Sequence, residues 1–372
     1  MRIAFDAKRA FENSTGLGVY SRQLIRGLAE HADPSWALYL FCPNKSKKEN
    51  FLIENQKIKN IYPNRFFSAT GLGRSFWRRK ACVRDVQKNK IDLYHGLSHE
   101  LPIGLSCKKV VTFHDLLYLE FPEDFTAADR KLFDLRFRRS ANEADRIVSV
   151  SQHTKNALVK NYQISEKKIT VVPQTCHSQF HKKLSEGQLK QSLLRYGVTR
   201  PYVLNVGSFV GRKNQLFLLQ VFAELSPNFD VDLVLVGKGK EAPKLKKFVS
   251  EKNLSSRVHF IENIDFKDLP AFYQKANVFA YPTKGEGFGI PLHEAMASRC
   301  PIVLGDWSCN REVAGEGHIY VGSQEVSKWS HALQQALREA KIPSENQLLA
   351  LCSKSLKLLH AEKLRKVYSS LF

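Results

Sequence analysis

Short apolar segments alternate with longer polar and amphipathic segments along the chain. The apolar segments are mostly uninterrupted runs, which is typical of parallel strands buried on both faces. They lie at residues 2–6, 91–96, 108–115, 168–173, 201–208, 233–237, 258–264, 277–282 and 301–306. Segments with helical character lie between or after them, at residues 19–29, 185–196, 268–273, 290–299 and 344–372. This alternation predicts an α/β protein with parallel sheets.

The chain is long enough for two domains. Its 372 residues, of which 43% are hydrophobic, suit about two cores of ordinary size. Polar residues 174–199 interrupt the strand pattern and predict a linker that contains one helix. We therefore expect the first domain to end near residue 175, with a ligand crevice where the two domains meet.

A glycine-rich turn follows one of the predicted strands. The strand at residues 277–282 leads into the turn at residues 283–289, and the helix at residues 290–299 comes next. Gly287 and Gly289 carry no side chain, so backbone amides at the start of the helix can approach an anion closely. The turn is a candidate site for a diphosphate.

Two glutamates frame this turn. Glu286 precedes the helix and Glu294 lies inside it, and a carboxylate can accept two hydrogen bonds from a vicinal diol such as a ribose. The spacing alone carries little weight, because about one such pair is expected by chance in a chain of this length. In its context, however, residues 286–297 closely resemble the E-x7-E signature of retaining glycosyltransferases with the GT-B fold, family GT4 in particular.

The resemblance extends over nearly the whole chain and implies a domain plan. It implies two Rossmann-like domains facing a central cleft. Residues 1–175 would bind the acceptor, and residues 176–355 would bind the nucleotide sugar. Residues 356–372 would form a helix that returns to the first domain.

Two cations stand at the start of another predicted helix. Arg212 and Lys213 follow the strand at residues 201–208, where positive charge opposes the helix dipole but suits a clamped diphosphate. The alternative is a solvated turn. The stretch resembles the family's G-x-x-x-x-R-K-N form, in which the lysine contacts the donor diphosphate. Many members carry arginine where this chain has Ser208, so Arg212 would supply the second cation. The resemblance implies that the donor is bound by Gly207, Ser208, Arg212, Lys213, Glu286, Gly287, Phe288, Gly289 and Glu294.

Two predicted strands end in a histidine, His95 and His114. The carboxyl ends of parallel strands line the ligand crevice, although a lone histidine is more often structural. Residues 113–123 resemble a GT4 segment in which the histidine lies beside the transferred sugar, which favours His114 over His95. His95 and Asp115 are assigned to the acceptor side.

The predicted loop at residues 11–18 contains Gly16 and Gly18. It imitates a dinucleotide-binding fingerprint, but the third glycine is missing and the loop is too long for that motif. It also resembles a GT4 loop that borders the donor phosphates and the acceptor, and the two glycines are assigned to the acceptor side. An ordinary connecting loop is the alternative.

The formal net charge is +21, which indicates an anionic partner. Residues 65–84 hold six cations and no acidic residue, together with Phe66, Phe67, Phe76 and Trp77. This composition suits an anionic membrane surface better than nucleic acid, and we expect no nucleic acid. A solvated helix with its aromatic side chains in the core is the alternative. No apolar run is long enough to span a bilayer, so the contact would be peripheral.

No metal site is expected. The seven cysteines are scattered and never spaced as C-x-x-C, so a reducing cytosol fits better than a disulfide framework. Asp230 and Asp232 imitate the metal-binding D-x-D of the GT-A fold, but they precede a predicted strand, whereas ligands bind after strand ends. We predict no cofactor and no essential metal.

The resemblance implies an activity. The enzyme would move a sugar from a nucleotide-diphosphate sugar to a hydroxyl of a glycan or lipid-linked acceptor, with retention of configuration, in bacterial cell-surface polysaccharide or lipopolysaccharide synthesis. Glu286, Lys213 and His114 would be the catalytic residues. The beginning of the chain is typical of a strand and not of a signal peptide, so we expect the cytoplasmic face of the inner membrane. The alternatives are a nucleotide-sugar or nucleic-acid binding protein without turnover, an NDP-sugar epimerase and a phosphorylase.

Overall fold

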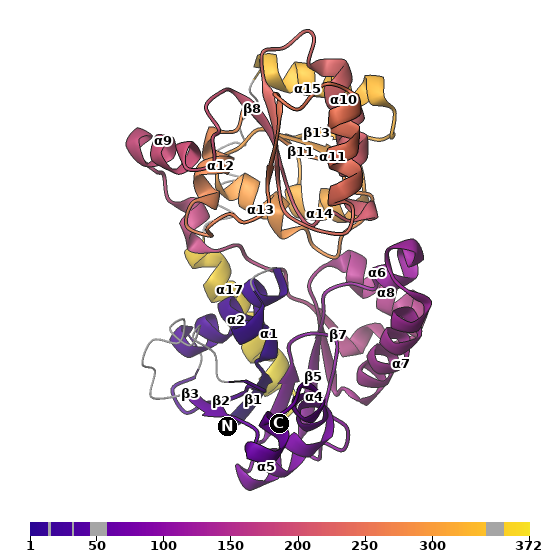
Figure 1. Cartoon of the computed structure of the whole chain (residues 1–372). Helices are drawn as coiled ribbons and strands as arrows, with labels where there is room; N and C mark the ends of the chain where they lie inside the picture. The colour runs from indigo at the N-terminus through magenta and orange to yellow at the C-terminus, as the bar shows by residue number, and fades with distance from the viewer. Residues whose placement is uncertain (14–15, 32, 45–57, 340–352) are drawn as a thin grey trace. The chain divides into compact units, whose positions relative to one another are not determined.

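The chain forms two compact units (Figure 1). The computed structural model describes residues 1–13, 16–31, 33–44, 58–339 and 353–372. Unit 1 consists of Met1–Glu120, Thr126–Thr175 and Lys354–Phe372, and unit 2 consists of Phe121–Phe125 and Cys176–Ser353. The chain therefore passes into unit 2 at the predicted linker. No pattern in the sequence predicted that residues 121–125 also belong to unit 2.

Unit 1 is built on a parallel seven-stranded sheet with the strand order β3-β2-β1-β4-β5-β6-β7. The strands are β1 (Arg2–Asp6), β2 (Ala37–Phe41), β3 (Ile58–Ile61), β4 (Leu93–Gly96), β5 (Lys108–Phe113), β6 (Arg146–Ser149) and β7 (Ile169–Val171). The order changes direction between β1 and β4, and in such sheets ligands bind outside the carboxyl ends of the strands at this point. Both predicted histidines lie at this edge.

Helices cover the sheet of unit 1 (Figure 1). They are α1 (Lys8–Glu12), α2 (Gly16–His31), α3 (Arg65–Ser68), α4 (Gly71–Phe76), the π-helical turn η2 (Trp77–Ala81), α5 (Cys82–Lys88), α6 (Leu117–Glu120), α7 (Ala127–Glu143), α8 (Gln152–Tyr162), η4 (Glu166–Lys168) and α17 (Ser353–Ser369). The last of these returns to unit 1, as predicted, and Tyr368 packs against Trp36. Residues 344–352 of the predicted final helix lie outside the described residues.

Unit 2 is built on a parallel six-stranded sheet with the order β10-β9-β8-β11-β12-β13. The strands are β8 (Tyr202–Val206), β9 (Asp232–Val236), β10 (Val258–Ile261), β11 (Val278–Tyr281), β12 (Ile302–Gly305) and β13 (Ile319–Val321). Its helices are η3 (Pro122–Asp124), η5 (Ser178–His181), α9 (Glu186–Leu194), η6 (Gly211–Lys213), α10 (Gln215–Leu225), α11 (Ala242–Glu251), α12 (Leu269–Lys275), α13 (Ile290–Ala297), α14 (Ser308–Ala314) and α15 (Val326–Glu339). The order reverses between β8 and β11, which makes this the expected binding edge.

Side chains of successive strand residues enter two different cores in unit 2. Leu204 and Tyr281 pack with α13 on one face of the sheet, whereas Val203 and Ala280 pack with α10 and α15 on the other. This is the alternation expected of strands buried on both faces. It directs Tyr281, the last residue of β11, toward the helix that follows the glycine-rich turn.

The predicted end of the loop at residues 11–18 is wrong. Helix α2 begins at Gly16, so Gly16 and Gly18 lie in its first turn, and α1 precedes it. A Cβ atom on Gly18 would collide with the carbonyl oxygen of Asn13, where α1 ends. Gly18 therefore allows a close approach of backbone. The strands β2, β3 and β13 and the helices α7, α11 and α15 were not predicted.

Candidate active site

The glycine-rich turn links β11 to α13 as predicted. Gly289 precedes the helix with a φ of 88°, in the left-handed region that favours glycine. A Cβ atom there would lie 3.3 Å from the hydroxyl of Tyr281. Pro291 lies in the first turn of α13, where its missing N–H costs nothing. The turn therefore needs glycine both for its backbone conformation and for the room beside Tyr281.

Lys213, Arg212 and Glu286 form one buried cluster, although more than 70 residues separate the cations from the acid. The ammonium of Lys213 donates to Oε1 of Glu286, and Arg212 Nη1 lies 3.4 Å from Oε2. Thr283 Oγ1 also donates to Oε1, at 2.8 Å. Three of the residues predicted to bind the donor, Arg212, Lys213 and Glu286, thus lie together within unit 2.

The charges of this cluster perturb one another. Burial alone would raise the pKa of Glu286, but Lys213, Arg212 and the hydrogen bonds outweigh burial and hold that pKa below its ordinary value. Burial lowers the pKa of Lys213, and the charge of Glu286 only partly opposes this effect. Two cations thus share one ionised carboxylate in a buried place, an arrangement that suits an added anion.

Gly207 and Ser208 lie beside this cluster. A Cβ atom added to Gly207 would lie 3.7 Å from Cδ and Cε of Lys213, so the lysine stem passes beside this glycine. Ser208 is exposed, and its carbonyl oxygen accepts a hydrogen bond from Gln215 at 3.1 Å. The ammonium of Lys213 lies 5.5 Å from the ring centre of Tyr281. Lys213 thus contacts both Glu286 and the ring of Tyr281.

Glu294 lies on α13 with partners of its own. It is 5% exposed, and Tyr273 donates a hydrogen bond to its Oε2 at 2.9 Å. Burial raises the pKa of Glu294 to about 8, against the lowering effect of that hydrogen bond. Glu294 is therefore protonated at neutral pH in the free protein, unlike the ionised Glu286. Phe288 packs edge-on against His293 on the same helix.

His114 is a buried neutral imidazole in unit 1. Its Nδ1 accepts a hydrogen bond from Gln174 at 2.7 Å, and its Nε2 donates to the carbonyl oxygen of Leu97 at 2.9 Å. Burial lowers its pKa to about 3, and His99 contributes further. Tyr20 of α2 meets the ring edge-on at 4.7 Å between ring centres. The start of α2, which holds Gly16 and Gly18, thus belongs to the same neighbourhood.

His95 lies deeper in the core. Its Nδ1 is 2.6 Å from the hydroxyl of Tyr368 and its Nε2 is 2.8 Å from Oγ1 of Thr112. Burial lowers the pKa of His95 to about 3. Both ring nitrogens are engaged, which is the arrangement of a structural histidine. Its acceptor-side role stays a prediction that these contacts do not favour.

Several residues of these sites were not predicted. His99 has a left-handed backbone, and its Nε2 accepts hydrogen bonds from the backbone amides of His114 and Asp115 at 3.1 and 3.4 Å. The side chain of Asp115 itself accepts from the amide of Leu117 at 3.2 Å. In unit 2, the carboxylate of Asp124 accepts from the amides of Gly211 and Arg212, both at 3.1 Å. The partners of His99 and Asp124 are distant in sequence, and no local sequence pattern indicates them.

Residues 65–84 divide into an exposed part and a buried part. Phe66, Leu72 and Phe76 are 81%, 86% and 46% exposed. Trp77, however, is 2% exposed and stacks on Phe41, so the expectation that its ring is available to a membrane is wrong.

Arg78 is also unavailable. It pairs with Asp6 at 2.7 Å and with Glu100 at 3.2 Å, and only 15% of its side chain is exposed. A count of cations in the sequence does not distinguish this structural arginine from the exposed Arg65, Lys80 and Arg84.

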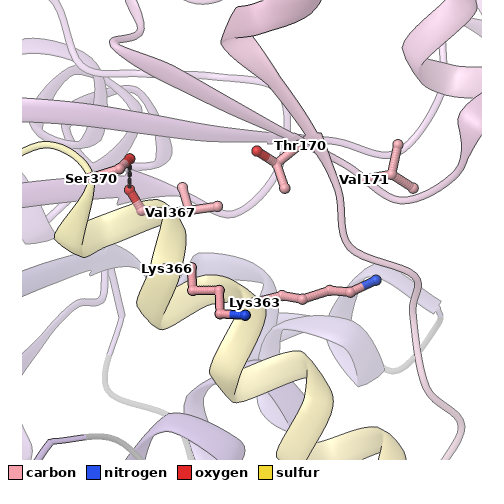
Figure 2. Close-up of a pocket in the computed structure, with 6 residues that line it drawn as sticks. All are labelled: Thr170, Val171, Lys363, Lys366, Val367 and Ser370. Carbon is pink, nitrogen blue, oxygen red and sulfur yellow. Dashed lines mark hydrogen bonds between the residues drawn. The ribbon is translucent and has the colours of Figure 1, made fainter.

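A cavity of about 300 Å³ lies elsewhere in unit 1 (Figure 2). It lies between the end of β7 and α17, and it is lined by Thr170, Val171, Lys363, Lys366, Val367 and Ser370. No residue that the sequence assigned to the donor or acceptor sites lines it.

The aspartates that imitate a metal motif have other partners. Asp232 accepts hydrogen bonds from Arg257 at 3.1 Å and His259 at 2.8 Å, and Asp230 pairs with Arg200. Within residues 1–13, 16–31, 33–44, 58–339 and 353–372, no three His, Cys, Asp or Glu side chains are grouped as metal ligands. The expectation that no metal is essential stays a prediction.

Two Rossmann-like units, with a buried cation–carboxylate cluster and a glycine turn at the switch point of the second, have the architecture of the GT-B fold. Residues 191–348 match the family described as glycosyl transferases group 1, and residues 14–180 match glycosyltransferase family 4. The two matches together cover most of the chain. The chain belongs to this family, as its sequence motifs predicted.

Curated relatives and solved structures agree with this assignment. The O-antigen chain mannosyltransferase B of Escherichia coli is 25% identical over 91% of this chain and 91% of its own length. The O-antigen chain mannosyltransferase RfbU of Salmonella typhimurium is 27% identical over 63% of this chain and 62% of its own length. The crystal structure of Anabaena HepE in complex with UDP-glucose matches with a TM-score of 0.74 and 15% identity, over 100% of both chains. At this identity the last match shows the fold.

Proposed function

We propose that the enzyme transfers a sugar from a nucleotide-diphosphate sugar to a hydroxyl of a glycan or lipid-linked acceptor, in the synthesis of a bacterial surface polysaccharide or lipopolysaccharide. The buried cluster of Lys213, Arg212 and Glu286 beside the glycine turn carries this proposal. Two relatives named as O-antigen mannosyltransferases support the acceptor class and favour a mannose donor. The UDP-glucose bound to HepE supports a nucleotide-sugar donor.

Lys213 and Arg212 would neutralise the diphosphate as it leaves. Negative charge grows on this group in the transition state, and cations fixed in a buried place stabilise such charge without reorganising. These two side chains would take the place of a metal ion, so turnover is expected without one. The ammonium of Lys213 is already positioned by Glu286 and by the ring of Tyr281.

Glu286 would orient the reacting groups. Its Oε1 accepts hydrogen bonds from Lys213 and Thr283, and its pKa is held low, so it is an ionised and fixed acceptor. A carboxylate bound in this way is a weak nucleophile. Retention is then served better by attack on the same face that the diphosphate leaves, with the departing phosphate taking the acceptor proton, than by a covalent intermediate.

His114 would line the acceptor side as a neutral imidazole. Its pKa of about 3 makes it a poor proton carrier near pH 7, where an effective acid or base has a pKa close to the working pH. Gln174 and the Leu97 carbonyl oxygen fix its tautomer, and this supports a positioning role.

The exposed part of residues 65–84 would dock the enzyme on an anionic membrane at the cytoplasmic face of the inner membrane. Phe66, Leu72 and Phe76 can insert, and each nearby cation adds about 1 kcal/mol of attraction. None of the helices that the structure describes is long and apolar enough to cross a bilayer.

Vesicle sedimentation tests this docking. Wild-type protein should pellet with anionic vesicles at low salt and less at high salt, because salt screens surface attraction. Replacing Arg65, Lys80 and Arg84 by glutamine should release it. The control replaces the exposed lysines of α11, which are Lys244, Lys246 and Lys247, in the same way and should pellet like wild type. Equal pelleting of both variants would contradict the docking surface.

A panel of nucleotide sugars tests the transfer activity. Thermal shift with uridine- and guanosine-diphosphate sugars should reveal a stabilising donor, because a ligand that binds only the folded state raises the melting temperature. Release of nucleoside diphosphate from that donor, faster with acceptor, would establish turnover. Stabilisation without any release would favour a binding protein instead.

A further inference from the structure

Tyr281 carries a buried hydroxyl that has no partner. The residue ends β11 and is 1% exposed. Among the described residues its hydroxyl makes no hydrogen bond of ordinary geometry, and the nearby carboxylate of Glu286 already accepts from Lys213 and Thr283. A buried hydroxyl without a partner destabilises the folded protein, so such groups are rare and need an explanation.

Other buried tyrosines of unit 2 are satisfied. Tyr202 donates to the carbonyl oxygen of Phe272 at 2.7 Å, and Tyr273 donates to Glu294 at 2.9 Å. Both are at most 2% exposed, as Tyr281 is. Among the buried tyrosines described in unit 2, the exception is the one at the end of β11, and the hydroxyl of Ser323 is a second buried hydroxyl without a partner.

The surroundings of this hydroxyl are those of the donor site. The ammonium of Lys213 lies 5.5 Å from the ring centre of Tyr281. Gly289, at the start of α13, leaves room beside the hydroxyl, because a Cβ atom there would lie only 3.3 Å from it. Burial raises the pKa of Tyr281 well above its ordinary value, and both the charge of the Glu286 carboxylate and its closeness to the hydroxyl add to this effect. The phenol therefore keeps its proton and can donate a hydrogen bond.

An oxygen with negative charge is the partner that fits this place. The two nearby cations favour an anion, and phenolic hydroxyls donate their strongest hydrogen bonds to charged acceptors. A hydroxyl of the donor sugar would instead face two cations that it cannot neutralise. The diphosphate group, whose charge matches Lys213 and Arg212, suits the hydroxyl better.

We propose that the hydroxyl of Tyr281 donates a hydrogen bond to a diphosphate oxygen of the nucleotide-sugar donor, and that Tyr281 is therefore a donor-binding residue. This inference rests on the proposed function. It explains why the hydroxyl is left without a partner in the free protein, because the ligand supplies the acceptor.

Replacement of Tyr281 by phenylalanine is the sharpest test. The Tyr281→Phe variant keeps the ring under Lys213 and removes only the hydroxyl. Calorimetric titration with UDP and GDP should give a dissociation constant about tenfold higher than that of wild type for whichever nucleotide the wild type binds, as for the loss of one hydrogen bond to a charged group. The melting temperature of the free variant should equal or exceed that of wild type, because an unsatisfied buried group has been removed.

Tyr202→Phe is the matched control. It removes a hydroxyl that donates to the backbone carbonyl oxygen of Phe272. Tyr202 is the first residue of β8, the strand beside β11. This variant should melt at a lower temperature and bind the nucleotide as well as wild type does. The two variants thus separate a structural hydroxyl from a ligand-binding one.

The outcomes that overturn the assignment are distinct. Equal nucleotide affinity of Tyr281→Phe and wild type, or a lowered melting temperature with unchanged affinity, would overturn the role of Tyr281 alone. A loss of affinity for the nucleotide sugar without a loss for the free nucleoside diphosphate would move the contact to the sugar and refute the diphosphate assignment. A wild-type protein that binds neither nucleotide nor nucleotide sugar would overturn the proposed function and this inference together.

Discussion

Replacement of Glu294 by glutamine should change how stability depends on pH. Burial raises the pKa of Glu294 from its ordinary 4.5 to about 8 in the folded protein, whereas the unfolded chain restores the ordinary value. Between these values the folded state binds more protons than the unfolded state. The free energy of unfolding therefore falls as the pH rises from about 4.5 to 8, by at most about 1.4 kcal/mol per pH unit from this one carboxyl group.

The size of the effect follows from the width of that window. Across the whole window it amounts to at most about 5 kcal/mol, a large share of the 5–15 kcal/mol that is typical of folded proteins. The buried histidines act in the opposite sense at lower pH. The pKa values of His95 and His114 are lowered to about 3, so they add stability as the pH rises from about 3 to 6.5. A comparison of variant and wild type at each pH removes their contribution.

Urea unfolding followed by circular dichroism at pH 5.5, 7.0 and 8.5 measures this difference. Glu294→Gln keeps the size of the side chain and can still accept the hydrogen bond from Tyr273. The stability of the variant relative to wild type should rise progressively from pH 5.5 to 7.0 and 8.5, by about 3 kcal/mol in all. A constant difference between the two proteins at all three pH values would refute a raised pKa at this position.

Three further perturbations test other parts of the account. Lys213→Ala should lower turnover more than donor affinity, because its charge acts mainly as the diphosphate leaves, and a change confined to KM would contradict that role. Arg78→Gln should lower the free energy of unfolding by about 3–5 kcal/mol in chemical denaturation, since it leaves the buried Asp6 without its cation while Glu100 keeps Arg136, and a loss below about 1 kcal/mol would show that the pair with Asp6 matters little. Turnover should persist in excess EDTA, and activity lost on chelation and restored by Mg²⁺ or Mn²⁺ would reject metal independence.

The closeness of Lys213 and Glu286, at the core of the proposed donor site, could be predicted because it follows from the fold. Lys213 and Glu286 lie far apart in sequence, but each follows a strand of the same parallel sheet. Parallel strands bring their carboxyl ends to one edge, so an apolar run followed by a turn is enough to place both residues together. The need for glycine at position 289 could also be predicted, but for a different reason. The turn into α13 takes a left-handed backbone conformation there, which glycine adopts most easily.

Other features could not be read from the chain because they depend on which face of an element is buried. Trp77 and Arg78 lie in the π-helical turn η2, which shifts the helical periodicity, and both side chains point inward. Asp124 binds the amides of Gly211 and Arg212 across a long stretch of sequence, with no periodic signal. Tyr281 looked like one more apolar strand residue, and only the missing partner of its hydroxyl distinguishes it.

The most direct test of glycosyl transfer follows the anomeric carbon. Donor sugars labelled with ¹³C at C1 can be incubated with enzyme and a panel of simple glycoside acceptors, and NMR spectra recorded early report the configuration of the first product. An α-linked donor that gives an α-linked product, with release of nucleoside diphosphate and strong suppression by Lys213→Ala, is the predicted result. A β-linked product would contradict retention, and a panel in which no donor is consumed would contradict the transfer activity itself.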